Sequence, residues 1–190
     1  MKTNSQIRQE TATLMRGNWS TMAVIAVVFG VFYLFTANSF PLVLFVYCPL
    51  SLGLAMTMLH FVRGAKSVGV GNLFSAFNAK YYWKSMGLGV LIWVYTFLWS
   101  LLFVVPGIIK IYSYFLAPYI LADNPNITAE EAICRSMRMM DGRKMQLFLM
   151  TLGYALLVML STFLFCIPLL WVVPYYNAVF AKFYEEVKNR

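Results

Sequence analysis

Charged side chains are scarce in this sequence, and their absence from long stretches is its most informative feature. Only 12% of the residues are charged, whereas 61% are hydrophobic, and this balance lies outside that of soluble globular domains. Asp, Glu, Lys and Arg are absent from Thr21 to Val62 and from Met145 to Ala181, and the stretch from Ser85 to Ala122 contains only Lys110. We therefore expect no soluble domain and no conventional soluble active site.

Residue types that bind metals or perform catalysis are also few. The three cysteines, Cys48, Cys134 and Cys166, have no paired spacing and no neighbouring histidine, so neither a disulfide framework nor a zinc site is expected. The single histidine, His60, has no Cys, Asp or Glu at ligand spacing. The hydrophobic runs contain no carboxylate that would couple transport to protons or sodium. We expect a non-enzymatic protein without a cofactor.

Each of the three hydrophobic runs is long enough for two membrane crossings. The first has 42 residues, which as a helix would be about 63 Å long, roughly twice the 30 Å hydrocarbon core of a bilayer. Each run must therefore cross, turn and return. The sequence predicts an all-α fold, a polytopic membrane bundle of six transmembrane helices arranged as three hairpins, in one integral membrane domain over residues 1–190.

Basic residues are confined to one side of this predicted bundle. Fourteen of the fifteen Lys and Arg residues precede, separate or follow the hairpins, whereas the predicted turns near Asn38–Pro41, Val105–Gly107 and Cys166–Pro168 are uncharged. The positive-inside rule then places both termini in the cytoplasm. The net charge of +8 therefore indicates contact with anionic lipid headgroups and not with nucleic acid.

The chain also divides into three related units of about 5–63, 70–125 and 128–187. In each unit a proline follows 22 residues after the start of the first crossing, at the predicted outer turn. Each unit begins with a short amphipathic segment that is expected to lie in the cytoplasmic interface. In the second unit, Leu73, Phe74 and Phe77 are expected on one side of that segment.

The amphipathic segment of the third unit has the clearest signals. Thr128 to Glu131 has the sequence of a capping box, which predicts a helix start at this point. Apolar residues then recur at helical spacing opposite basic ones; the apolar positions are Ile133, Met137 and Met140, and the basic positions are Arg135 and Arg138.

Lys110 is the one charge within a hydrophobic run. It follows Pro106 by four residues, about 6 Å below the predicted outer turn, and Ser113 and Tyr114 share its helical face. Two interpretations stay open. Lys110 either snorkels to the interface and fixes the depth of the helix, or faces the bundle and holds an anionic group, such as a lipid phosphate or a substrate carboxylate.

The sixth predicted crossing has polar residues beside a proline. Pro174, which frees a backbone carbonyl, is followed by Tyr175, Tyr176 and Asn177. These polar residues either line a cavity or hydrogen-bond to neighbouring helices, and we favour the second interpretation. Pro118 is expected to bend the fourth crossing.

A turn is predicted where the fourth crossing ends. Asp123, Asn124 and Pro125 are typical turn residues and lead to the predicted cap at Thr128. A structural role is the favoured interpretation for Asp123, with pairing to Arg135, Arg138 or Arg143 as an addition.

Two stretches carry a resemblance to a known family: VPGIIKIYSYFLAPYILADNP at Val105–Pro125 and WVVPYYNAVFAKFYEEV at Trp171–Val187. With EAICRSMRMMDGRKMQLF between them, they resemble a bacterial integral-membrane family known as domain of unknown function nine-seven-five. The layout is more distantly similar to the membrane domain of some glycerophosphodiester phosphodiesterases, but this chain has no attached hydrolase domain. The resemblance implies a fold and a location in the bacterial cytoplasmic membrane, without a biochemical activity.

Three functions are compatible with the sequence. The leading hypothesis is a membrane protein that engages lipids or another envelope protein, with Lys110 and the cytoplasmic basic residues as headgroup contacts. The first alternative is a small-solute transporter or pore with a path near Lys110 and Tyr175 to Asn177. The second alternative is a lipid-modifying enzyme. A cavity that opens toward lipid would favour the leading hypothesis. A water-filled cavity at Lys110 would favour the transporter. The sequence does not predict the oligomeric state.

Overall fold

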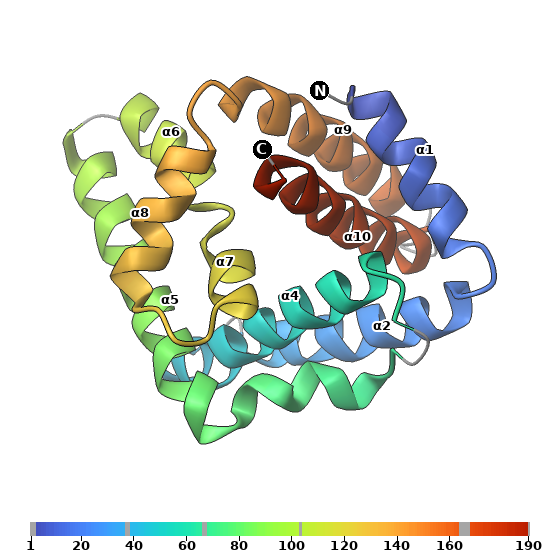
Figure 1. Ribbon diagram of the computed structural model, residues 1–190, viewed down its shortest axis with the longest axis horizontal. Coiled ribbons are helices and arrows are strands. Elements are labelled where there is room, and N and C mark those ends of the chain that lie inside the picture. The colour runs from blue at the N-terminus through green and yellow to red at the C-terminus, as the bar shows by residue number, and fades with distance from the viewer. Residues whose placement is uncertain (1–2, 37–38, 66–67, 103, 164–167, 190) are drawn as a thin grey trace.

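A computed structural model describes residues 3–36, 39–65, 68–102, 104–163 and 168–189. Within these ranges the chain is helical and contains no strand (Figure 1), which confirms the predicted all-α class. The elements are α1 (Asn4–Met15), α2 (Trp19–Thr36), α3 (Phe40–Leu42), the π-helix η1 (Val43–Tyr47), α4 (Cys48–Val62), the 3-10 helix η2 (Val70–Phe77), α5 (Ala79–Leu102), α6 (Val104–Tyr114), α7 (Ala117–Asp123), α8 (Ala129–Met139), α9 (Lys144–Phe163) and α10 (Leu169–Lys188).

Five stretches of the described chain are long and apolar enough to cross a membrane. They are Trp19–Thr36, Val43–Val62, Ala79–Leu101, Val105–Asp123 and Lys144–Phe163. Helix α10 is not among them, because its second half carries Lys182, Glu185, Glu186 and Lys188. The structure thus supports a polytopic membrane protein, whereas the count of six crossings stays a prediction.

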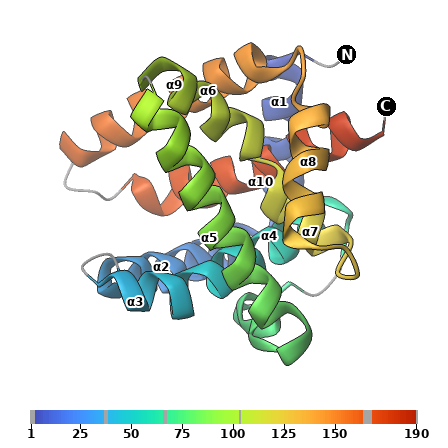
Figure 2. The ribbon, with the colours of Figure 1, turned by 90° about the vertical axis from the view of Figure 1, so that its left-hand side faces the viewer.

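Helix α4 lies at the centre of the molecule. It packs against η2, α5, α7 and α10, and Figure 1 shows it beside α2, with α9 and α10 next to each other and α1 along the side of α10. In Figure 2, α5 and α6 run obliquely down the picture while α2 and α10 run across it. The second predicted hairpin therefore crosses the other helices instead of running parallel to them.

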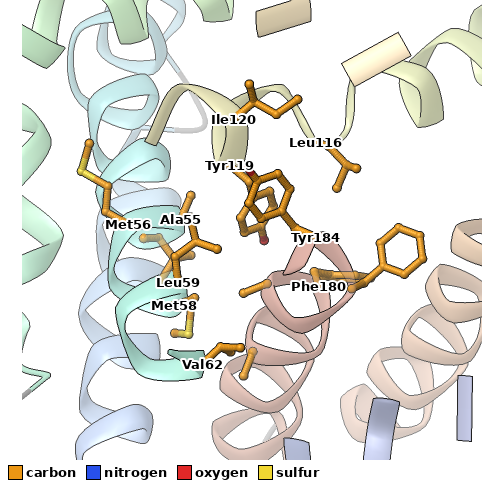
Figure 3. Packing of buried hydrophobic residues seen from close by; sticks show 14 of the residues in the cluster. Ala55, Met56, Met58, Leu59, Val62, Leu116, Tyr119, Ile120, Phe180 and Tyr184 are labelled. Atoms are coloured by element: carbon orange, nitrogen blue, oxygen red, sulfur yellow. The ribbon is translucent and has the colours of Figure 1, made fainter. Parts of the chain in front are cut away.

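The core joins one segment from each predicted hairpin. Figure 3 shows Ala55 and Leu59 of α4 facing Tyr119 of α7 and Tyr184 of α10, and all four side chains are buried. The rings of Tyr119 and Tyr184 stack, with 5.8 Å between their centroids. This core extends along the whole of α4 and reaches the C-terminal ends of α7 and α10. The C-terminal ends of these three helices are the predicted cytoplasmic ends of the three hairpins.

The opposite ends of several helices expose large apolar side chains. Leu34 and Phe35 of α2 are 70% and 77% exposed, and Phe163 at the end of α9 is 78% exposed. Such a broad apolar surface is typical of contact with lipid. Asn38 of the first predicted outer turn and Cys166 of the third lie outside the described residues.

Prolines interrupt two of the predicted crossings. Pro118 has no N–H for the carbonyl of Tyr114, and the fourth crossing divides at this point into α6 and α7. Pro49 likewise leaves the carbonyl of Phe45 without its helical donor, and the hydroxyl of Tyr82 donates to that carbonyl over 3.2 Å. The π-helix η1 directly precedes Pro49 in the chain.

The amphipathic segment of the second unit differs from expectation. Leu73 and Ala76 are buried, whereas Phe74 and Phe77 are partly exposed and contact each other. The segment is a 3-10 helix, in which residues three apart share a face. Leu73 therefore does not share the face of Phe74 and Phe77, contrary to the pattern expected for an α-helix.

Candidate functional site

A cavity with an apolar lining lies between the first and second predicted hairpins. It has a volume of about 590 Å³, and it is bounded by η1 and the start of α4 on one side and by α5 on the other, with Ile111 and Pro118 also in its wall. Its lining is apolar except for a few polar side chains: Tyr47, Cys48, Ser51, Ser85 and Thr96. The hydroxyls of Ser51 and Ser85 donate to carbonyls of their own helices.

Thr96 is the exception among these hydroxyls. Its oxygen is buried and has no hydrogen-bond partner among the described residues. Because an unpaired buried hydroxyl is costly in an apolar environment, Thr96 is an unsatisfied polar group within the wall of the cavity. Gly89 permits the close approach of the helices here, since a β-carbon at that position would lie 2.4 Å from the sulfur of Cys48.

A second apolar cavity of about 400 Å³ adjoins the first. Tyr47, Ser51, Ile92, Ile111 and Pro118 line both cavities. The second cavity extends to other helices, where Phe29 of α2 and Asn177 and Phe180 of α10 complete its wall. At its other edge the first cavity reaches the exposed side chains of Val90 and Trp93. Together they form an apolar space that begins at the surface of α5 and ends at α10.

Lys110 faces a third, smaller cavity. Its ammonium lies 4.5 Å from the ring centroid of Trp99 and 4.0 Å from the sulfur of Met137 in α8. Ser113 is buried, and its carbonyl accepts a hydrogen bond of 2.7 Å from Ser136 of α8. Tyr114 lines the same cavity as Lys110. Lys110 and Tyr114 of the predicted polar stripe therefore share one face, which points to α8, whereas the Ser113 hydroxyl donates to the carbonyl of Ile109 in its own helix.

This contact changes the expected placement of α8. Ala129, at the start of α8, lies near Gly87 of α5, and Met137, two turns later, lies near Lys110. Helix α8 thus packs lengthwise along the second hairpin, whereas the sequence placed α8 and Lys110 at opposite faces of the membrane. Its amphipathic pattern is as predicted: Ile133 and Met140 are buried and Arg135 is exposed.

Tyr175, Tyr176 and Asn177 are not brought together with Lys110. The hydroxyl of Tyr175 donates to the carbonyl of Arg8 in α1 over 3.0 Å, and the buried ring of Tyr176 lies 5.7 Å from the Arg8 guanidinium. The amide of Asn177 donates to the carbonyl of Val173. The two tyrosines therefore hold α1 against α10, while Asn177 reaches the wall of the second apolar cavity.

Asp123 joins the ends of three helices. Its carboxylate, 9% exposed, pairs with Arg63 at 2.7 Å and with Lys188, and it accepts a hydrogen bond of 3.1 Å from Tyr184. Arg63 also pairs with Glu185 at 2.7 Å. Desolvation lowers the pKa of Arg63, but hydrogen bonds to Asp123 and Glu185 outweigh it and raise that pKa. Within the described residues, Asp123 forms no ion pair with the partners expected from the sequence, Arg135, Arg138 and Arg143, and Arg135 pairs with Glu131 instead.

The predicted turn and helix cap are present. Helix α7 ends at Asp123, Asn124 caps it, and the carbonyl of Pro125 accepts a hydrogen bond of 2.5 Å from Lys84. Thr128 caps α8 by accepting from the amide of Glu131 over 3.2 Å. The expected reciprocal bond of a capping box is replaced, since the Glu131 carboxylate pairs with Arg135.

Several residues of these sites were not predicted from the sequence. Glu130, treated only as part of the cap, lines the cavity of Lys110. A complete capping box joins Thr3 and Gln6 at the start of α1, and the spacing of these two residues was its signal. No local pattern marks Tyr47, Ser51 and Thr96 as neighbours across a cavity. Within the described ranges, no group of three or more His, Cys, Asp or Glu residues is placed to hold a metal ion.

Comparison with known proteins supports the family resemblance and adds no activity. Searches of curated proteins and of solved structures give no match, so the similarity to glycerophosphodiester phosphodiesterase membrane domains stays an expectation. One family matches at residues 1–113 and again at 102–190, which together cover the chain. This protein therefore belongs to the family described as "Protein of unknown function (DUF975)".

Proposed function

We propose that this protein binds a membrane lipid and holds its acyl chain in the apolar cavity between η1, α4 and α5. The observation that carries the proposal is the cavity itself, which has about 590 Å³ and a nearly continuous apolar lining. Ligand sites usually enclose about 300 to 1,000 Å³ and combine apolar walls with a few polar groups. The proposal includes no chemical step.

The edge of the cavity suits a ligand that enters from the bilayer. Val90 and Trp93 of α5 line it and are 39% and 56% exposed, so a chain can enter beside α5 without passing through water. A small polar solute, as in the alternative hypothesis, would find few hydrogen-bond partners in this lining.

The observations give less support to a solute path between Lys110 and Asn177. These residues line different cavities, and Tyr114 is the residue that the two linings share. The buried Tyr114 ring therefore separates the space at Lys110 from the space at Asn177. A lipid site requires no such path, because its ligand enters and leaves sideways.

We also propose that the chain forms three hairpins, with α10 as the sixth crossing and both termini in the cytoplasm. The ends of α4, α7 and α10 meet at Asp123, which supports a common side for the ends of the three units. Residues Leu169 to Ala181 of α10 are uncharged and pack beside α9.

Lipid retention in native mass spectrometry tests the lipid proposal. In Ser51→Phe a ring would fill the junction of the two apolar cavities, and we expect co-purified lipid to fall about tenfold, the equivalent of about 1.4 kcal/mol. Thr162→Phe is the matched control, because Thr162 is exposed on α9 and, like Ser51, bonds a carbonyl of its own helix. Equal retention in the two variants and the wild type would contradict the proposal.

A further inference from the structure

A polar cavity separate from the proposed acyl-chain site lies between α5, α6 and α8. It has a volume of about 230 Å³. Two side chains of opposite charge, Lys110 of α6 and Glu130 of α8, line it. Tyr95, Trp99 and Tyr114 contribute aromatic rings to its wall, and Ile133, Cys134 and Met137 complete it.

The two charges face one cavity without forming an ion pair with each other. Lys110 contacts the ring of Trp99 and the sulfur of Met137, and neither group neutralises an ammonium as a carboxylate would. In the described part of the chain, Glu130 has no ion pair. Its neighbour Glu131 differs in this respect, because Glu131 pairs with Arg135 at 2.7 Å on the outer face of α8.

This arrangement selects against ligands of a single charge. An anion at Lys110 would be repelled by Glu130, and a cation at Glu130 would be repelled by Lys110. A molecule that carries both charges can satisfy both side chains. Aromatic ring faces also attract ammonium groups, and three rings line this cavity.

We propose that this cavity binds a small zwitterion, with its phosphate or carboxylate on Lys110 and its ammonium on Glu130 and the aromatic rings. The sequence alone suggested an anionic ligand for Lys110. The position of Glu130 in the same cavity favours a zwitterion instead of an anion. Two sources supply this chemistry: the headgroup of a zwitterionic lipid such as phosphatidylethanolamine, and a free solute such as glycerophosphoethanolamine. The site does not depend on the acyl-chain cavity.

The test measures charge selectivity in native mass spectrometry. The purified protein is equilibrated with equal amounts of phosphatidylethanolamine and phosphatidylglycerol that have the same acyl chains. We expect the wild type to retain the zwitterionic lipid about tenfold better, which corresponds to about one charge-assisted hydrogen bond. Glu130→Gln should shift the preference toward phosphatidylglycerol, because the repulsion of the anionic ligand is removed while Lys110 remains.

Two further variants separate this effect from a structural one. Glu131→Gln removes a carboxylate one residue away that lies outside the cavity lining, and it should keep the wild-type preference. Ser51→Phe should lower total lipid retention without changing the preference, so the failure of the acyl-chain proposal is distinguishable from the failure of this one. Lys110→Arg should keep the preference, and Lys110→Gln should lose it.

A parallel experiment measures the binding of glycerophosphoethanolamine by tryptophan fluorescence. Comparison of the wild type with Trp99→Phe identifies the signal of Trp99. Saturable quenching that requires both Lys110 and Glu130 would support a solute as the ligand, and selectivity for the diacyl lipid alone would support a headgroup. The proposal is overturned if neither probe binds, or if Glu130→Gln and Glu131→Gln have the same lipid preference.

Discussion

Replacing Asp123 by Asn tests whether the cluster at the ends of α4, α7 and α10 holds the three helices together. The substitution keeps the size of the side chain and removes its charge. Arg63 and Lys188 then lose the carboxylate that both of them contact, and the hydroxyl of Tyr184 loses a charged acceptor. We expect the helix ends to separate more readily while each helix remains intact.

The magnitude follows from the exposure of the three side chains. Exposed ion pairs contribute about 0 to 1 kcal/mol, and the loss of one member of a buried pair costs about 3 to 5 kcal/mol. Asp123 is 9% exposed, but Arg63 and Lys188 are 37% and 41% exposed, so both cations retain contact with water. Arg63 also retains Glu185. We therefore expect Asp123→Asn to lower the free energy of unfolding by about 1 to 3 kcal/mol.

Unfolding by sodium dodecyl sulfate in mixed micelles, followed by circular dichroism, measures this change. Glu131→Gln is the control, because the Glu131–Arg135 pair is about 45% exposed on both sides and contributes about 0.5 kcal/mol or less. A double-mutant cycle with Arg63→Gln should give a coupling energy of about 1 kcal/mol. The reasoning is refuted if Asp123→Asn is no more destabilising than Glu131→Gln.

Three further predictions follow from other parts of the chain. Gly53→Ala should destabilise the protein by about 1 to 3 kcal/mol, because the added β-carbon would lie 1.9 Å from the carbonyl oxygen of Leu73. Gly30→Ala is the control, because a β-carbon at that position would have no neighbouring atom within 4 Å. It should be neutral or stabilising in the same assay. Thr128→Ala should weaken α8 by about 0.5 to 2 kcal/mol. The change is measured as faster amide exchange from Ala129 to Met137, and unchanged exchange would contradict the observed cap. In a variant without native cysteines, Ser39→Cys and Val105→Cys should react with an impermeant thiol reagent from outside the cell, and Ser67→Cys, at a position outside the described residues, should not. Val105 is preferred to Gly107 of the same predicted turn, because a β-carbon at Gly107 would lie 2.3 Å from the Ser100 hydroxyl. Labelling of Ser67→Cys would overturn the proposed orientation.

Features that depend on local composition and spacing could be predicted from the amino-acid sequence. Long uncharged runs predicted a polytopic all-α membrane protein because a bilayer excludes charge over a fixed thickness. The division at Pro118, the turn at Asp123 and the cap at Thr128 were predictable for a similar reason. Each depends on the backbone chemistry of a few consecutive residues, and the structure contains all three.

The contacts between polar residues far apart in the chain could not be predicted in this way, because they depend on the packing of the helices. Asp123 lies 60 residues from Arg63 and 65 from Lys188 in the chain, and nearer arginines offered an equally plausible partner from charge alone. Glu130 and Lys110 come to share a cavity because α8 packs along the second hairpin. The apolar cavities arise where η1, α4 and α5 pack incompletely. Such contacts depend on how helices are placed in three dimensions, and residue spacing along one helix does not specify that placement.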